Sequence, residues 1–373
     1  MRTLIRGTPV AELRDPAVSA LFLYSVEGAG SADASAILSP WAGHPLLSLR
    51  RAEAGPEGQR YVGRTAEVDW TLAHDTHLLR VTLSLPGEQP PSVWAGLRRS
   101  LDELVDQARQ SSAPARPWAV TRLAHGTVPG GTQAAAAALV ADASALGLEP
   151  ADVARAEASP YGWLWVRGQG WVRAPGAQDP HWQRELILLT PQDRAEPARA
   201  LFLEPVSQGL ARIELYLHKS AHHAREHEAV RAALERAMAA LQGQMLAALH
   251  SGDLERPHER SAGLDRVAQR LMRFQLQRAQ TEVLLNSLRN NLDALNQHLE
   301  RVGLEAPHYR QQAAQLARQA EQLESDLRNA RVVSESSYVF QDIQRAAEAT
   351  RLERSTYLMG AAAALLAAVA IFN

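Results

Sequence analysis

Hydrophobic positions along the chain follow two different periods, and the change between them lies near residue 206. Before that point, short apolar stretches alternate with polar residues or stand between prolines and glycines, which is typical of strands and short helices. After it, apolar residues recur every three or four positions over long stretches, which predicts helices packed on helices. Eighteen of the twenty prolines and all eight tryptophans precede residue 206. Because proline interrupts helices, the second half is free to form long ones.

The first half mixes strand and helix signals. Residues Leu79–Leu85 alternate apolar and polar side chains, the period of a half-buried strand, and Ala20–Val26 is apolar on both faces. Pro91 stands where a helix can begin, and apolar residues follow it at spacings of three and four from Trp94. Extended character returns over Trp118–Leu123. The order of strands in a sheet does not follow from these patterns.

Four further elements complete this half. The sequence predicts an alanine-rich helix over 132–146, an aromatic hairpin over 163–173 broken by its glycines, and short strands over 186–189 and 200–203. Residues 1–205 are therefore predicted to form one α+β or α/β domain.

The second half is predicted to be all-α. A first long helix occupies 206–252, a linker 253–263 follows, and a coiled-coil hairpin or stalk spans 264–356. The heptad seam from Leu264 to Val302 is interrupted by only two polar residues, Arg278 and Thr281. A turn at 303–307 then predicts that the two hairpin helices run antiparallel.

The last residues, 357–373, contain no charge and are predicted to form a single C-terminal membrane-spanning helix. Arg345, Arg351 and Arg354 precede this run and nothing basic follows it, so the bulk of the chain is expected in the cytoplasm, anchored to an inner or plasma membrane. The alternative is a C-terminal helix that is buried in a bundle or against copies of itself. The residues predicted to contact the bilayer are Tyr357, Leu358, Leu365, Leu366, Val369, Ile371 and Phe372.

Composition limits the chemistry. Hydrophobic residues make up 46% of the 373 positions, enough for a buried core, and 39 basic residues nearly balance 41 acidic ones. The resulting charge of −2 argues against a nucleic-acid partner. Because the chain has no cysteine, disulfides, thiolate metal sites and thiol nucleophiles are excluded. The predominance of arginine over lysine reads as a composition bias and not as phosphate recognition.

One catalytic motif lies in the first long helix. His223, Glu226 and His227 have the HxxEH order, in which two histidines bind zinc and the glutamate acts as general base. His218 and His222 form a second pair one turn apart. Because no third ligand can be selected and short motifs match by chance, we favour an ordinary polar helix surface and predict no cofactor, with zinc as the alternative.

Other candidates for a site are weaker. Trp163, Trp165 and Trp171 have the chemistry to stack on a base or a sugar, but such residues more often form the core of a small sheet. His74, Asp75 and His77 resemble the metal-binding pair of phosphohydrolases, and we interpret them as a turn. The chain has no Walker lysine, no dinucleotide fingerprint and no GxSxG motif.

The organisation of the second half resembles the CorA-like family of membrane proteins. The segment Ala211–Ser220 (ARIELYLHKS), the stalk 309–354 and the apolar run 357–372 carry this resemblance. In that family, typical members are homopentameric channels for magnesium and related cations, with two membrane helices and a GMN signature. This chain has one apolar segment and no GMN. The resemblance therefore implies a degenerate member of the kind found in bacterial defence and signalling operons.

These features predict a non-enzymatic, membrane-anchored homo-oligomer that works as a sensor, effector or scaffold in such a system. Its N-terminal domain is expected to dock a ligand or protein partner, and its coiled coil is expected to join copies and couple to a lipid bilayer. The alternatives are a zinc-dependent hydrolase, CorA-like cation transport and a soluble oligomeric scaffold.

Overall fold

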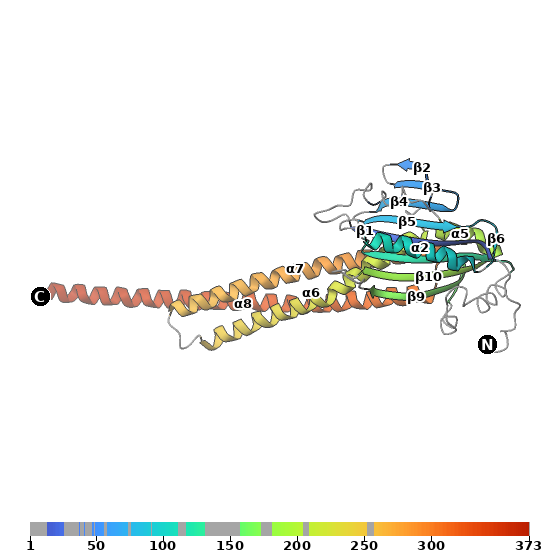
Figure 1. Cartoon of the computed structure of the whole chain (residues 1–373). Helices are drawn as coiled ribbons and strands as arrows, with labels where there is room; N and C mark the ends of the chain where they lie inside the picture. The colour runs from blue at the N-terminus through green and yellow to red at the C-terminus, as the bar shows by residue number, and fades with distance from the viewer. Residues whose placement is uncertain are drawn as a thin grey trace. The chain divides into compact units, whose positions relative to one another are not determined.

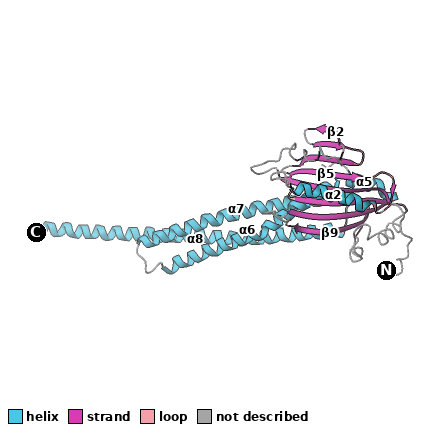
Figure 2. Ribbon diagram, in the orientation of Figure 1, coloured by secondary structure: helices cyan, strands magenta, loops and turns pink. Residues whose placement is uncertain are grey.

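A computed structural model of the chain describes residues 13–25, 49–55, 58–73, 76–90, 92–110, 117–130, 157–172, 181–203, 209–251 and 257–372, together with Ile37, Trp41 and Leu47. The described chain separates into a mixed sheet region followed by long helices (Figures 1 and 2). It divides into two compact units. The first is Met1–Ser220 with Asn291–Gln315, and the second is Ala221–Asn290 with Leu316–Asn373. The composition change at residue 206 thus lies before the point where the two units divide.

The strands of the first unit form one sheet among the described residues, in the order β2-β3-β4-β5-β1-β7-β10-β9-β8, with β6 beside β1. Among the described strands, only the pair β7 and β10 is parallel. The strands are β1 (Leu13–Ser25), β2 (Arg50–Gly55), β3 (Gly58–Val62), β4 (Ala66–Ala73), β5 (Thr76–Ser84), β6 (Glu88–Gln89), β7 (Ala119–Val128), β8 (Glu157–Ser159), β9 (Gly162–Val172) and β10 (His181–Pro191).

One face of this sheet is apolar and packs against α2 (Val93–Gln110), which crosses it in Figure 1. Apolar residues at spacings of three and four give α2 one buried stripe that contains Trp94, Leu101 and Leu104. Phe22 of β1 and Ile187 of β10 belong to the same core. The predictions of strands near 20–26, 79–85, 118–123 and 186–189 and of a helix after Pro91 are confirmed.

Two local predictions are wrong. Residues 200–203 belong to the helix α5 (Ala195–Leu203), which follows the 3-10 turn η1 (Gln192–Arg194) and carries Glu196 and Pro197 in its first turn, where both favour a helix. The predicted aromatic hairpin is one continuous strand, β9. Gly168 has φ +61° there, but the chain does not reverse, because β9 stays paired with β10 on both sides of a register shift. The predicted helix over 132–146 lies outside the described residues.

Three helices, α6 (Gly209–Ser251), α7 (Pro257–Val302) and α8 (Pro307–Phe372), confirm the all-α second half, and each contributes residues to both units. In the second unit, Arg289 lies 2.5 Å from Glu324, and Gln275 donates to the Tyr338 hydroxyl. Because the later residue of α7 meets the earlier residue of α8, these helices run antiparallel as predicted. Their core includes Leu234 of α6, with Leu241, Val267, Leu271, Phe274, Ala330, Val333 and Phe340.

The predicted C-terminal membrane helix is wrong. Among the residues that the structure describes, no helix has a stretch both long and apolar enough to cross a membrane. This finding also overturns the single-pass anchor and the inner- or plasma-membrane localisation inferred from it.

In the part of α8 with described side chains, charges recur up to Arg354: the residues 344–361 include Arg345, Glu348, Arg351, Glu353 and Arg354. A segment with this many charges is too polar to cross a hydrocarbon core. Tyr357 and Leu358 are exposed. The side chains of the other residues predicted to contact the bilayer lie outside those described: Leu365, Leu366, Val369, Ile371 and Phe372.

Candidate functional site

The second face of the sheet carries buried polar and charged side chains among apolar ones, which is the main unexpected feature of the first unit, and we name it the polar face. Side chains alternate between faces along a strand, so Phe22 and Val120 point to the α2 side while Ser19 and Thr121 point away from it. The first residues of α6 lie on this polar face. Leu210, Ala211 and Glu214 line a small cavity with Ser19, Leu21, Arg80, Thr121 and Leu123.

Glu214 is the centre of a buried polar cluster. Its carboxylate accepts hydrogen bonds from the Thr121 hydroxyl at 2.9 Å and the Tyr309 hydroxyl at 2.9 Å, and it forms an ion pair with Arg184 at 3.2 Å. Thr121 is 2% exposed and the other three residues are 0% exposed. A buried carboxylate is tolerated when charge and hydrogen bonds compensate its lost hydration. These residues come from β7, β10, α6 and α8, so the cluster joins four elements.

His218 lies one helical turn after Glu214 and extends the cluster. Its Nε2 is 2.6 Å from Thr121 Oγ1. Since the Thr121 hydroxyl donates to Glu214, His218 Nε2 is assigned as the protonated nitrogen that donates to Thr121. Burial, and then the positive charge of Arg184, hold the pKa of His218 well below its ordinary value. The imidazole is therefore neutral, and its ring meets Trp118 and Trp182 edge to face.

The beginning of α8 is held by the same cluster. The Arg184 guanidinium lies 4.7 Å from the centre of the Tyr309 ring, a cation–π contact. Burial and then the Glu214 charge raise the pKa of Tyr309 well above its ordinary value, so its hydroxyl stays a donor. The neighbouring His308 backbone amide donates to Glu157 at 2.9 Å, and Tyr161 donates to the Val302 carbonyl at the end of α7.

A second charged group lies on strands β3, β4 and β5. Arg80 Nη2 is 2.5 Å from Asp69 Oδ2, both nearly buried, and Arg60 Nε is 3.0 Å from Glu67 Oε1. Burial raises the pKa of Asp69 to about 6 despite the opposing charge of Arg80, and the Glu67 charge adds to that rise. Arg80 also lines the cavity beside Glu214.

The Glu214 cluster contains groups that catalysis uses, but its geometry does not suit a reaction. A threonine hydroxyl at hydrogen-bond distance from a histidine resembles a nucleophile and its base. However, Glu214 lies on the Nε2 side of His218, at 3.5 Å, and not behind Nδ1 where an orienting carboxylate is needed. The cavity has a volume of about 20 Å³, room for one water molecule. The arrangement fits a structural clamp.

The zinc motif of the sequence lies on α6 in the second unit. Glu226 approaches His223 Nδ1 at 3.8 Å and His222 Nε2 at 3.5 Å, and all three side chains are at least partly exposed. His227, in contrast, is buried, with 3% of its surface exposed. No group of three or more histidine, aspartate or glutamate side chains able to hold a metal ion occurs within the described part of the chain.

The tryptophans proposed to stack on a ligand occupy strand β9. Trp165 is 2% exposed and belongs to the core between the sheet and α2, and Trp163 packs against that core. Trp171 pairs with Trp182 of β10 in register, and its side chain lies outside those described. His77 is buried in β5 beside Trp70, whereas His74 and Asp75 lie outside the described residues.

The Glu214 cluster was not predicted from the sequence, although one signal for it is present. Glu214 and His218 stand one turn apart within a run of apolar residues, Ile213, Leu215 and Leu217, at the start of α6. A carboxylate in an apolar helical run predicts a buried partner. Its partners are far away in the sequence, and no local pattern identifies them.

Comparisons with protein-family models, with curated proteins and with solved structures find no match to this chain. The CorA-like resemblance is therefore not indicated by any of them, and the function has to be argued from the geometry alone.

Proposed function

We propose that the protein is a non-enzymatic oligomeric scaffold, in which the end of α8 joins copies and the sheet-containing unit offers the docking surface. The observation that carries this proposal is that the described side chains of α8 after Phe340 are not buried against any other described part of the chain. Phe340 is the last buried residue among the described side chains of the helix, and none of residues 341–361 is buried.

This uncovered segment is rich in large apolar side chains. Ile343, Leu352, Tyr357, Leu358 and Met359 are between 60% and 81% exposed. Most helical stability in proteins comes from tertiary packing, and a bare helix in water is marginal. Clustered exposed apolar side chains mark interaction surfaces. The segment therefore needs cover from another chain.

The pattern of side chains favours a second copy as that cover. Exposed residues at spacings of three and four form a second stripe along α8, separate from its buried stripe. We name it the outer stripe, and it begins at Val332, next to the buried core residue Val333. Its members are Val332, Ser336, Val339, Ile343, Ala346, Thr350, Glu353, Tyr357 and Ala361. Glu353 alone is charged. Because this is the same spacing that packs α7 on α8, identical stripes of two copies suit a coiled-coil seam.

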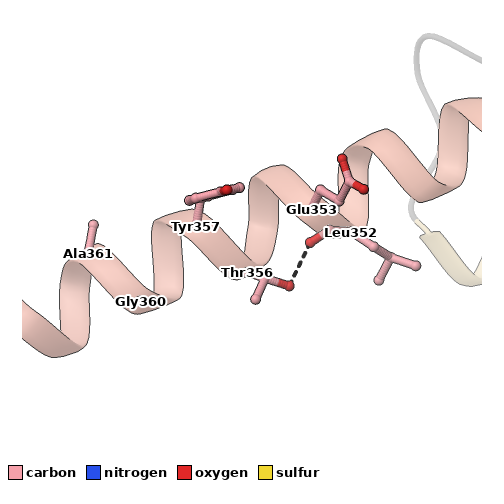
Figure 3. A pocket seen from close by; sticks show the side chains of 6 residues that line it. All are labelled: Leu352, Glu353, Thr356, Tyr357, Gly360 and Ala361. Carbon is pink, nitrogen blue, oxygen red and sulfur yellow. Dashed lines mark hydrogen bonds between the residues drawn. The ribbon is translucent and has the colours of Figure 1, made fainter.

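Figure 3 shows the end of this stripe. Glu353, Tyr357 and Ala361 point to one side of α8, and Leu352 and Thr356 point to the other. The Thr356 hydroxyl donates to the Leu352 carbonyl at 2.8 Å, which satisfies it within its own helix. Leu352 is apolar and exposed but lies off the outer stripe, so it provides a matched control.

Light scattering coupled to size-exclusion chromatography tests the proposal. The full chain should elute at a multiple of its 40.7 kDa mass at micromolar concentration. The double variant Ile343→Asp, Tyr357→Asp should shift it to 40.7 kDa because it places carboxylates in the seam. Leu352→Asp should leave the mass unchanged. A wild-type protein that stays at 40.7 kDa at every concentration would overturn the proposal.

A further inference from the structure

The second unit also contains a basic groove between α6 and α7. Gln244 of α6 and Arg266, Gln269, Arg270 and Arg273 of α7 line it, and it encloses about 290 Å³. The arginines are spaced at i, i+4 and i+7, so they share one face of α7. We name this feature the arginine groove.

Among the described side chains, the arginine groove concentrates positive charge without a neighbouring carboxylate. Some other arginines of the second unit do meet carboxylates, as Arg231 does with Asp326 and Arg278 with Glu282. No carboxylate of the described residues forms an ion pair with any of the three groove arginines. The sequence explains this local excess, because neither 236–250 of α6 nor 266–281 of α7 contains an acidic residue. In a chain of net charge −2, these arginines form a local concentration of positive charge.

The lining specifies a ligand class. Each guanidinium presents a planar fork of donors that matches the oxygens of phosphate, and the glutamine amides add neutral donors. The lining contains no aromatic side chain on which a base can stack and no carboxylate to bind a cation. The three arginines span about 10 Å along the helix. This length suits several linked phosphate groups better than a single one.

We propose that the arginine groove binds a small, multiply charged phosphate compound, such as a free triphosphate. This goes beyond the scaffold function and is independent of it, because the groove shares no residue with the outer stripe of α8. The second unit would thus have a ligand site in the arginine groove, separate from the outer stripe through which copies associate.

Calorimetric titration of the full-length protein with inorganic triphosphate tests the inference. Binding should be saturable with one site per chain. Loss of one guanidinium removes a charge-assisted hydrogen bond, so affinity should fall roughly tenfold for each. Arg266→Gln with Arg270→Gln should then weaken binding about a hundredfold.

Two further variants decide whether the groove or only the net charge is responsible. Arg318→Gln with Arg328→Gln removes two exposed arginines of α8 and should leave the affinity within about twofold, since solvent screens distant surface charges. Arg270→Lys keeps the charge but loses the fork, so it should weaken binding by less than Arg270→Gln does, roughly threefold. Equal losses in the groove and control variants, or wild-type binding no tighter than that of the double groove variant, would overturn the inference. Circular dichroism confirms that each variant stays helical.

Discussion

The Tyr309 hydroxyl donates a hydrogen bond of 2.9 Å to Glu214, and both side chains are completely buried. Tyr309 stands in the first turn of α8 and Glu214 in the second turn of α6, so this bond ties the starts of two long helices together. Arg184 of β10 completes the contact, through an ion pair with Glu214 and a cation–π contact with Tyr309. The helices are thereby fixed on the polar face of the sheet.

Removing either partner of this bond should destabilise the first unit. Tyr309→Phe takes one donor from a buried carboxylate, at a cost of about 1–3 kcal/mol. Glu214→Ala leaves the charge of Arg184 buried without its carboxylate and should cost about 3–5 kcal/mol. Tryptophan fluorescence during urea unfolding measures both, because all eight tryptophans precede residue 206 and report on the first unit.

The double variant and a surface control make this prediction specific. Because the two residues touch, their effects should be non-additive by about 0.5–3 kcal/mol. Arg310 forms a 2.8 Å ion pair with Glu305, but both side chains are more than 60% exposed. Arg310→Ala should therefore change the free energy of unfolding by no more than about 1 kcal/mol. A cost for Tyr309→Phe as small as that of the surface variant would contradict the role given to the cluster.

Acid should weaken the first unit through its buried histidines. Burial, and then the positive charge of Arg199, lower the pKa of His125 to about 4. Between pH 6.5 and 4, His125 is protonated in the unfolded chain but stays neutral in the folded protein. The free energy of unfolding therefore falls as the pH falls. The loss should be roughly 3 kcal/mol for this residue. His125→Gln, which keeps an acceptor or donor near Thr190, should flatten the dependence measured by urea unfolding at pH 7, 6, 5 and 4.

Asp69 has the opposite effect on the free energy of unfolding over part of the same pH range. Its pKa is raised to about 6 in the folded protein, so the folded state binds the proton first as the pH falls from 6 toward 3.8. Stability from this group therefore increases on acidification. Asp69→Asn removes this contribution and should make the acid loss steeper. A slope unchanged in both His125→Gln and Asp69→Asn would show that neither group controls the pH dependence.

The sequence predicted the elements whose signal is local and repeated. The heptads from Leu264 to Val302 and the scarcity of proline were sufficient for α7, for the turn at Gly303 and for the antiparallel start of α8. The apolar runs of β1 and β10 predicted strands equally well, because strands that are buried on one or both faces need such residues.

The errors arose where the local signal had a second meaning. The glycines of β9 suggested a turn, but Gly168 and Gly170 have positive φ within a strand that continues. The charge-free tail 357–373 suggested a membrane span, but a run without charge is also typical of a helix that is buried against another helix or against copies of itself. The Glu214 cluster was not predicted, because Thr121, Arg184 and Tyr309 are polar residues in ordinary contexts and only the tertiary fold brings them to one carboxylate.

Gly126 of β7 should tolerate no side chain, because a Cβ atom there would stand 2.6 Å from the Trp94 ring of α2. Trp94 is 3% exposed, so it has no free space in which to move. Gly126→Ala should therefore push α2 off the sheet and cost about 1–3 kcal/mol in free energy of unfolding. Gly96 in the same helix meets no atom within 4 Å, and Gly96→Ala should stabilise the protein by up to about 1 kcal/mol through helix propensity. The urea concentration at the midpoint of unfolding should therefore fall for Gly126→Ala and rise for Gly96→Ala. Stabilisation in both would mean that α2 does not pack as closely on β7 as the Trp94 contact implies.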